Sequence, residues 1–176
     1  MVGQGRSIMR QEKTRGPKRE ASSSKGFSLI ELLVVVAVIL ILVAIAIPNF
    51  VKSKMRANEA SAVHNLRNIC TAQVVYSTTY GIGFSDSLNS LGGSAAIVDQ
   101  TSAELIDVVL ASGTKSGYIF TLTVLTTDAQ GHVTSYSVSA DPQLVNSTGV
   151  RHFYSDQTSV IRSNDTTAAG PSDTPI

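Results

Sequence analysis

The chain has 176 residues, of which 43% are hydrophobic and 15% are charged, so it can hold one modest domain and one apolar segment but not a multidomain enzyme. The formal net charge of +1 hides a segregation. Residues 1–26 carry seven Lys/Arg and two Asp/Glu, and residues 27–176 carry the other seven of 14 Lys/Arg and eleven of 13 Asp/Glu. A basic leader before an acidic body argues against nucleic-acid binding, because phosphate contacts need cations gathered on the functional domain.

Residues 1–26 are predicted to be a basic leader. They mix Gly, Ser, Lys and Arg without any helical or strand period, which predicts disorder. The chain has a single cysteine, Cys70, so no intrachain disulfide can form, and a buried thiol is expected there.

An apolar run follows from Phe27 to Ile47, interrupted only by Ser28 and Glu31. At about 1.5 Å per residue it reaches roughly 31 Å as a helix, which matches a bilayer hydrocarbon core of about 30 Å. Residues 27–47 are therefore predicted to span a membrane. The excess of Lys/Arg in the leader places the N-terminus in the cytoplasm.

The helix is expected to continue past Pro48, with a kink there, to about residue 80. Apolar residues recur at spacings of three and four from Glu59 to Val74, and Gly81 and Gly83 supply the stop. Pro48 has two open interpretations: a simple kink at the membrane exit, or a weak point where the helix stretches in an assembly.

Residues 81–162 are expected to form the globular part. Thr101 and Glu104 have the spacing of a capping box, which predicts a short helix over residues 101–111. Alternation over residues 118–125 and 133–140 predicts one hairpin, and residues 151–154 with 160–162 predict a shorter one. Residues 163–176 are predicted to be a flexible tail.

The segment Gly26-Phe27-Ser28-Leu29-Ile30-Glu31-Leu32, running into an uninterrupted apolar helix, resembles the prepilin signature of type IV pilins and type II secretion pseudopilins. The resemblance implies that a membrane-bound prepilin peptidase cuts after Gly26 and methylates the new N-terminal residue, Phe27. It implies an α+β, pilin-like lollipop fold, in which a long kinked N-terminal helix packs on a small antiparallel sheet of about four strands. It also implies assembly into a helical homo-oligomeric filament.

Glu31 is the residue expected to matter most for assembly. A carboxylate inside a membrane helix costs about 2.5 to 3.5 kcal/mol at a central position, so an unpaired Glu31 needs a partner. Cleavage creates a cationic amine on Phe27, four residues before Glu31 and about one helical turn away. The resemblance favours the amine of a neighbouring subunit.

The location implied is the inner membrane for the precursor, with lipid and the pilus or secretion assembly machinery as partners, and then a cell-surface filament. A type IV pilin is favoured over a major pseudopilin of type II secretion, because no compact acidic calcium loop is recognisable in the C-terminal part. Two further alternatives are a signal peptide cut after Ala44-Ile45-Ala46, and a plain membrane anchor. Neither explains the position of Glu31.

No catalytic, cofactor or metal site is predicted. His64, His132 and His152 are scattered, and no nucleophile–base spacing or glycine-rich phosphate loop is present. Asp128, Asp141 and Asp156 fall in separate turns, which is typical of solvated turn residues rather than of calcium ligands.

Overall fold

The structure of the chain is a computed structural model that describes residues 26–93 and 97–176. Nearly all of the predicted leader, residues 1–25, lies outside the described residues. The contacts between residues divide the chain into a first unit that ends at Ile41 and a second unit, Leu42–Ile176. The helices are α1 (Leu29–Tyr80), α2 (Leu88–Leu91) and α3 (Val108–Ala111); the strands are β1 (Thr114–Lys115), β2 (Tyr118–Thr127), β3 (Val133–Pro142), β4 (His152–Asp156), β5 (Arg162–Asn164) and β6 (Thr174–Pro175).

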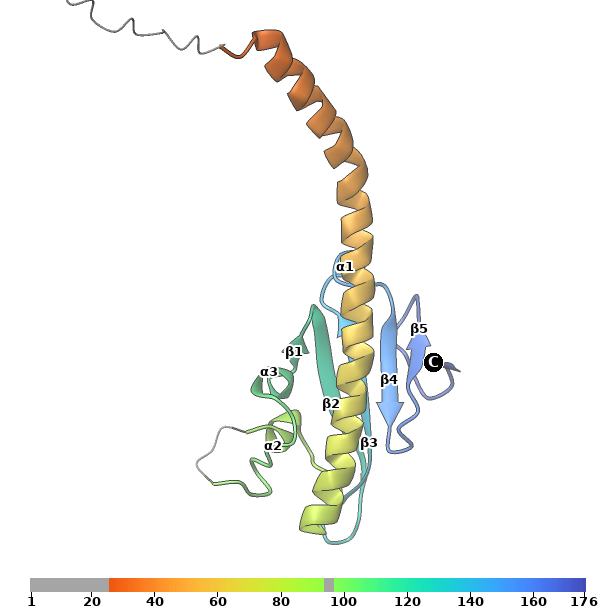
Figure 1. Cartoon of the computed structure of the whole chain (residues 1–176). Helices are drawn as coiled ribbons and strands as arrows, with labels where there is room; N and C mark the ends of the chain where they lie inside the picture. Colours follow the sequence, from red (N-terminus) through yellow and green to blue (C-terminus); the bar gives the residue numbers. More distant parts are fainter. Residues whose placement is uncertain (1–25, 94–96) are drawn as a thin grey trace, which may run out of the picture. The chain divides into compact units, whose positions relative to one another are not determined.

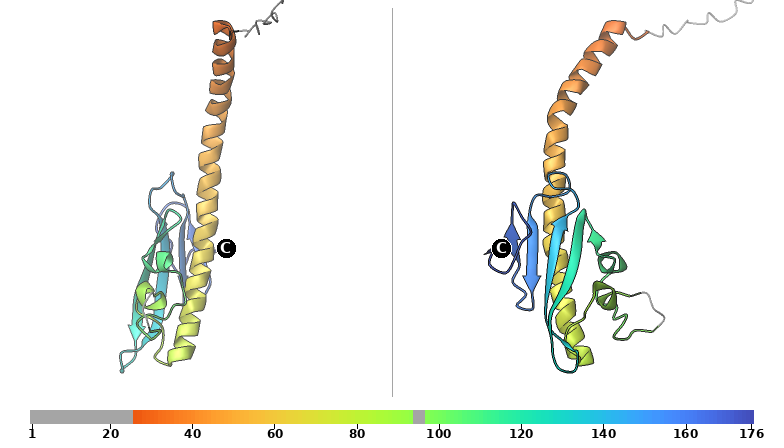
Figure 2. Two further views of the ribbon diagram at one scale, coloured as in Figure 1. Left: turned by 60° about the vertical axis from the view of Figure 1, so that its left-hand side comes forward. Right: turned by 180° about the vertical axis from the view of Figure 1, so that it is seen from behind.

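Helix α1 is continuous over 52 residues and ends where glycine follows. Gly81 has φ of +66°, a conformation that closes helices and that glycine adopts without strain. In the second unit, α1 lies along one face of the sheet, so helix and sheet form two layers (Figures 1 and 2). The predicted α+β, pilin-like fold with a long N-terminal helix on an antiparallel sheet is confirmed.

The sheet has six antiparallel strands in the order β1-β2-β3-β4-β5-β6. Its centre is the predicted hairpin of β2 and β3, where Leu122 pairs with Val138. The sheet has six strands instead of the expected four because β1 and β6 add two residues each at its edges. A strand of two residues is too short to carry an alternating pattern.

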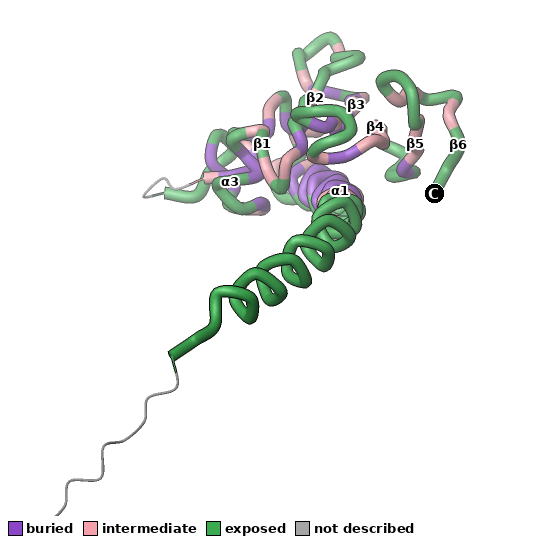
Figure 3. Tube along the Cα trace, turned by 90° about the horizontal axis from the view of Figure 1, so that it is seen from above, coloured by how far each residue is buried: buried purple, intermediate pink, exposed green. Residues whose placement is uncertain are grey.

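The core lies between the C-terminal half of α1 and the inner face of the sheet. Leu66 and Ile69 of α1 are fully buried, as are Tyr118, Val138 and Phe153 of the strands. Cys70 is also buried, as expected. Burial changes along α1: the residues before the second half are exposed, and buried positions appear where the sheet covers the helix (Figure 3). The apolar residues that recur at spacings of three and four therefore lie on the face of α1 that the sheet covers.

The predicted start of the helix over residues 101–111 is wrong. The helix is only the four-residue α3, and its N-cap is Asp107, whose carboxylate accepts a hydrogen bond from the Leu110 N–H at 3.0 Å. Glu104 has φ of +53°, which no helix allows. The Thr101 N–H donates instead to the carboxylate of Asp99 at 2.8 Å, so the capping box does not form.

The predicted loose tail from residue 163 is also corrected, since it is tied to the sheet edge. Ser163 pairs with Thr174 in β6, and the guanidinium of Arg162 donates to the Asp173 carbonyl at 2.9 Å. The Ile176 N–H donates to the Ile161 carbonyl at 3.0 Å. These bonds join residues 11 to 15 positions apart, and composition alone does not indicate such pairing.

Candidate assembly segment

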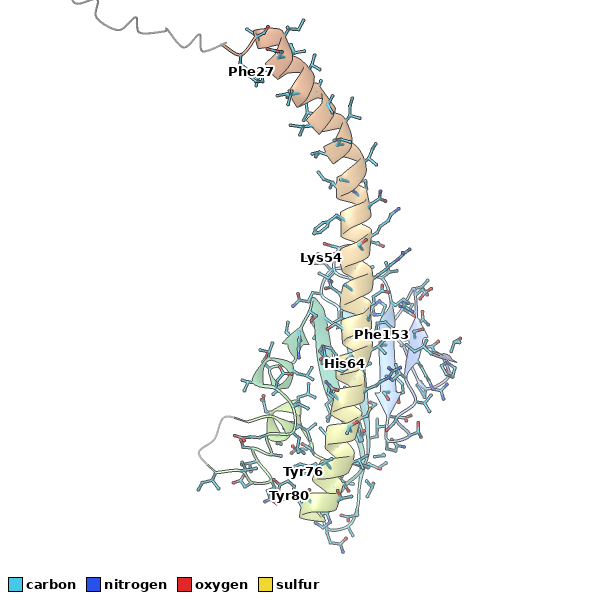
Figure 4. The ribbon with its side chains drawn as sticks, viewed as in Figure 1. Phe27, Lys54, His64, Tyr76, Tyr80 and Phe153 are labelled. Carbon is cyan, nitrogen blue, oxygen red and sulfur yellow. The ribbon has the colours of Figure 1, made fainter. Side chains whose placement is uncertain are left out.

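The described part of the first unit begins with three non-helical, exposed residues, Gly26, Phe27 and Ser28, before α1 starts at Leu29. A Cβ built on Gly26 would meet no atom within 4 Å. Packing among the described residues therefore does not require glycine at this position. Phe27 is 76% exposed, and its side chain is labelled in Figure 4.

Glu31 lies in the first turn of α1, and its side chain caps the N-terminus of the helix. Its carboxylate accepts a hydrogen bond from the Ser28 N–H at 2.9 Å, and the Ser28 carbonyl accepts the first helical bond from Leu32 at 3.2 Å. This is the reach-back half of a capping box, in which the third helical residue satisfies the backbone N–H of the N-cap. Ser28 is thus a structural partner of Glu31 that the sequence interpretation missed, although the S-x-x-E spacing signals it.

The apolar residues of α1 up to Val51 are exposed along the helix. Helix α1 is long and apolar enough, by length and composition, to cross a membrane, and the residues of its most apolar stretch are not buried in the chain. The large exposed side chains include Leu29, Ile30, Leu32, Leu33, Val34, Val35, Val36, Val38, Ile39, Leu40, Ile41, Leu42, Val43, Ile45, Ile47, Phe50 and Val51. An apolar surface of this extent marks an interaction with lipid or protein.

Helix α1 passes through Pro48 without interruption. Proline has no N–H, so the carbonyl of Ala44 lacks its usual helical donor. One residue later, the side-chain amide of Asn49 donates to the Ile45 carbonyl at 3.1 Å. The kink at Pro48 stays a prediction.

In the second unit, Glu59 ties α1 to the loop between β3 and β4. Its carboxylate accepts hydrogen bonds from the Val150 N–H (3.0 Å), the Arg151 N–H (3.3 Å) and the Arg151 Nε (2.9 Å). Burial alone would raise the pKa of Glu59, but the bonds from Val150 and Arg151 outweigh it and lower the pKa below its ordinary value. The helical pattern placed Glu59 among apolar positions without indicating this partner.

The histidines lie apart in the second unit. His132 pairs with Asp128 at 3.0 Å and His152 with Asp141 at 2.6 Å, whereas His64 contacts Asn68 on the exposed side of α1. Among the described residues, no three His, Cys, Asp or Glu side chains gather in an arrangement that could hold a metal ion.

In comparison with known proteins, residues 21–47 match the family model of the prokaryotic N-terminal methylation motif. That match covers Gly26 and the whole apolar run from Phe27 to Ile47 but no part of the globular body. The wider comparison is with a fimbrial protein of Pseudomonas aeruginosa, 35% identical over 111 residues that cover 54% of this chain and 72% of the relative. The chain belongs to the type IV pilin family.

Two other pilins match over shorter segments. The type IV major pilin protein PilA of Myxococcus xanthus is 45% identical over 69 residues, 39% of this chain and 31% of the relative. The type IV wide pilus major component PilA4 of Thermus thermophilus is 43% identical over 54 residues, 31% of this chain and 41% of the relative. The chain thus spans less than half the length of these two relatives. No solved structure matches it.

Proposed function

We propose that this pilin is the structural subunit of a type IV pilus-like filament, processed after Gly26 and assembled through the N-terminal half of α1. The observation that carries the proposal is the exposed apolar surface of residues 27–51 with a single carboxylate, Glu31, near its start. In water this surface must be covered. Lipid covers it in the precursor, and sister helices cover it in the filament.

The geometry around Gly26 supports processing at this bond. Gly26 and Phe27 are exposed and non-helical, as a protease needs for access to a backbone. The space around Gly26 leaves the preference for glycine to the prepilin peptidase. Cleavage frees the amine of Phe27, and methylation keeps it cationic.

Glu31 then sets the register between subunits. The Ser28 N–H uses one position on its carboxylate, and an ionised carboxylate can accept about four hydrogen bonds. The amine of Phe27 from a neighbouring copy pairs with a free position. This pairing offsets the cost of a carboxylate in an apolar setting, which is about 2.5 to 3.5 kcal/mol at the centre of a membrane helix.

The precursor's partners follow from the same features. The basic leader holds the N-terminus on the cytoplasmic side of the inner membrane, where the peptidase and the pilus assembly machinery reach the chain. The acidic body lies on the opposite side and reaches the cell surface in the filament. No cofactor or catalytic step is part of this role.

The test is Glu31→Ala, with filaments imaged and counted by electron microscopy. We expect filaments to be lost, while N-terminal sequencing still finds a methylated Phe27, so that the defect lies in assembly. Ser28→Ala is the matched control, because it keeps the N–H that Glu31 accepts, and we expect wild-type filaments from it. Wild-type filament numbers from Glu31→Ala, or a product that begins at another residue, would contradict the proposal.

A further inference from the structure

Charge is unevenly distributed in the second unit. No Lys or Arg occurs between Asn68 and Thr114 or between Ser116 and Val150. Three exposed cations lie on α1 just after the apolar run: Lys52, Lys54 and Arg56. Positive charge is therefore concentrated where α1 enters the body.

Two of these cations line a hollow of about 300 Å³, with Arg151, Glu59 and Asp165 also on its wall. Lys52 and Arg56 share one side of the helix because they are four residues apart. Glu59 already pairs with Arg151. Among the described residues, Lys52 and Arg56 make no ion pair. We call the surface formed by Lys52, Arg56 and Arg151 the basic hollow.

The other end of the body carries exposed carboxylates. Among the described residues, no Lys or Arg lines the hollow there, and the histidine that does, His132, pairs with Asp128. Tyr76 donates to the Gln100 carbonyl at 2.8 Å, next to Asp99, and lines a hollow together with Gln100 and Asp86. Asp86 and Asp99 are exposed and make no ion pair among the described residues. Burial first, and then the charges of Asp86 and Asp99, raise the pKa of Tyr76. We call Asp86 and Asp99 the acidic end.

The two surfaces cannot meet within one chain. Arg56 and Tyr76 are twenty residues apart on one helix, which is about 30 Å. Figure 4 shows Lys54 near one end of the body and Tyr76 and Tyr80 at the other. An ion pair between these two surfaces can therefore form only between two copies of the chain.

The geometry points to a second copy of this chain as that partner: the basic hollow of one subunit receives the acidic end of another. A two-fold contact centred on either surface would bring like charges together, whereas an antiparallel two-fold pair would use both surfaces of both copies and leave none free to extend a chain. A head-to-tail contact joins two different patches, and when it does not close it generates a helical filament. Opposite charges at the two ends therefore allow the head-to-tail contact and suppress a two-fold contact centred on one surface. The filament proposed above selects the head-to-tail contact.

This inference rests on the proposed filament function and adds a contact between globular bodies to the one made by Glu31. Its test is a charge swap in cells that assemble wild-type filaments. We expect Lys52→Glu with Arg56→Glu to lower the filament yield about tenfold or more, since like charges across an interface cost several kcal/mol. Asp86→Lys with Asp99→Lys should do the same, and all four changes together should restore filaments. Arg67→Glu, an exposed cation outside both surfaces, is the control and should have little effect.

Crosslinking gives a second readout that does not depend on reversed charges. Filaments of Lys52→Cys with Asp86→Cys, treated with a short bismaleimide, should yield a ladder of joined subunits, whereas Arg67→Cys with Asp86→Cys should not. Cys70 does not interfere because it is buried. Reversal variants that assemble like the wild type, or the absence of a ladder, overturn the pairing. A wild-type chain that forms no filaments would instead overturn the proposed function itself.

Discussion

The carboxylate of Glu59 and the guanidinium of Arg151 form an ion pair of 2.9 Å across 92 positions of sequence, with the Glu59 side chain 9% exposed and that of Arg151 40% exposed. The same carboxylate accepts the N–H groups of Val150 and Arg151. Glu59 thus fixes the loop after β3 to α1. Because Arg151 is partly exposed, most of the stabilisation comes from the part-buried bonds of the two backbone N–H groups and not from the charge of the pair.

Replacing Glu59 should therefore destabilise the body. We expect Glu59→Ala to lower the free energy of unfolding by about 2 to 3 kcal/mol, because it leaves two backbone N–H groups without an acceptor. Glu59→Gln keeps one acceptor oxygen and should cost less. Urea unfolding of the full chain in detergent measures both. Asp86→Ala, at an exposed position, should stay within about 0.5 kcal/mol of the wild type, and an equal loss in that control would contradict the role of Glu59.

The same carboxylate gives stability a pH dependence. Its pKa is lower in the folded chain than in the unfolded one, so its contribution is complete above the unfolded pKa of about 4.3. It is lost as the pH falls below that value and through the folded pKa. Between pH 6 and pH 3, wild type should therefore lose more stability than Glu59→Gln. Parallel pH profiles of the two proteins would show that Glu59 is not responsible.

Gln73 holds the chain that leaves α1. It is fully buried, its Oε1 accepts the Ser85 N–H at 2.7 Å, and its Nε2 donates to the Ser85 carbonyl at 3.1 Å. Gln73→Leu adds apolar surface to the core but leaves both backbone groups of Ser85 unpaired. We expect a loss of about 2 to 4 kcal/mol in unfolding free energy. Gln143→Leu, at an exposed site, is the control; a neutral or stabilising Gln73→Leu would be the contrary result.

Gly149 is required by packing and not by its backbone conformation, since its φ is not among the positive values. A Cβ there would overlap the hydroxyl of Tyr118, which is fully buried and donates to the Arg151 carbonyl at 2.9 Å. Gly149→Ala should destabilise the body by about 1 to 3 kcal/mol. Adding Tyr118→Phe, which removes the overlapping oxygen, should recover part of the loss. Strict additivity of the two changes in thermal unfolding would exclude this overlap.

Gly26 gives the opposite case, because none of the described residues lies near its missing side chain. Gly26→Val should leave the thermal unfolding of the body unchanged while blocking removal of the leader. Mass spectrometry of the membrane fraction would then find only the precursor, and filaments would be absent. Normal processing of Gly26→Val would show that the peptidase does not need glycine at this bond.

Much of the fold was predictable because its signals are local. The run from Phe27 to Ile47 and the apolar spacing up to Val74 indicate one long helix, which α1 confirms. Alternation over residues 118–125 and 133–140 indicates the central hairpin, which β2 and β3 confirm. The hydrogen bond from the Ser28 N–H to the Glu31 carboxylate also has a local signal, the S-x-x-E spacing, which the prediction did not use.

The apolar helix, its lone carboxylate and the central strands could be predicted from the amino-acid order, because each depends on residues a few positions apart. The folded chain was needed to show that Glu59 binds Arg151, that Gln73 binds Ser85 and that the tail pairs at the sheet edge. These contacts join segments between 11 and 92 residues apart. Their formation depends on which loops the packing of α1 against the sheet brings together, and no spacing within a single segment encodes that.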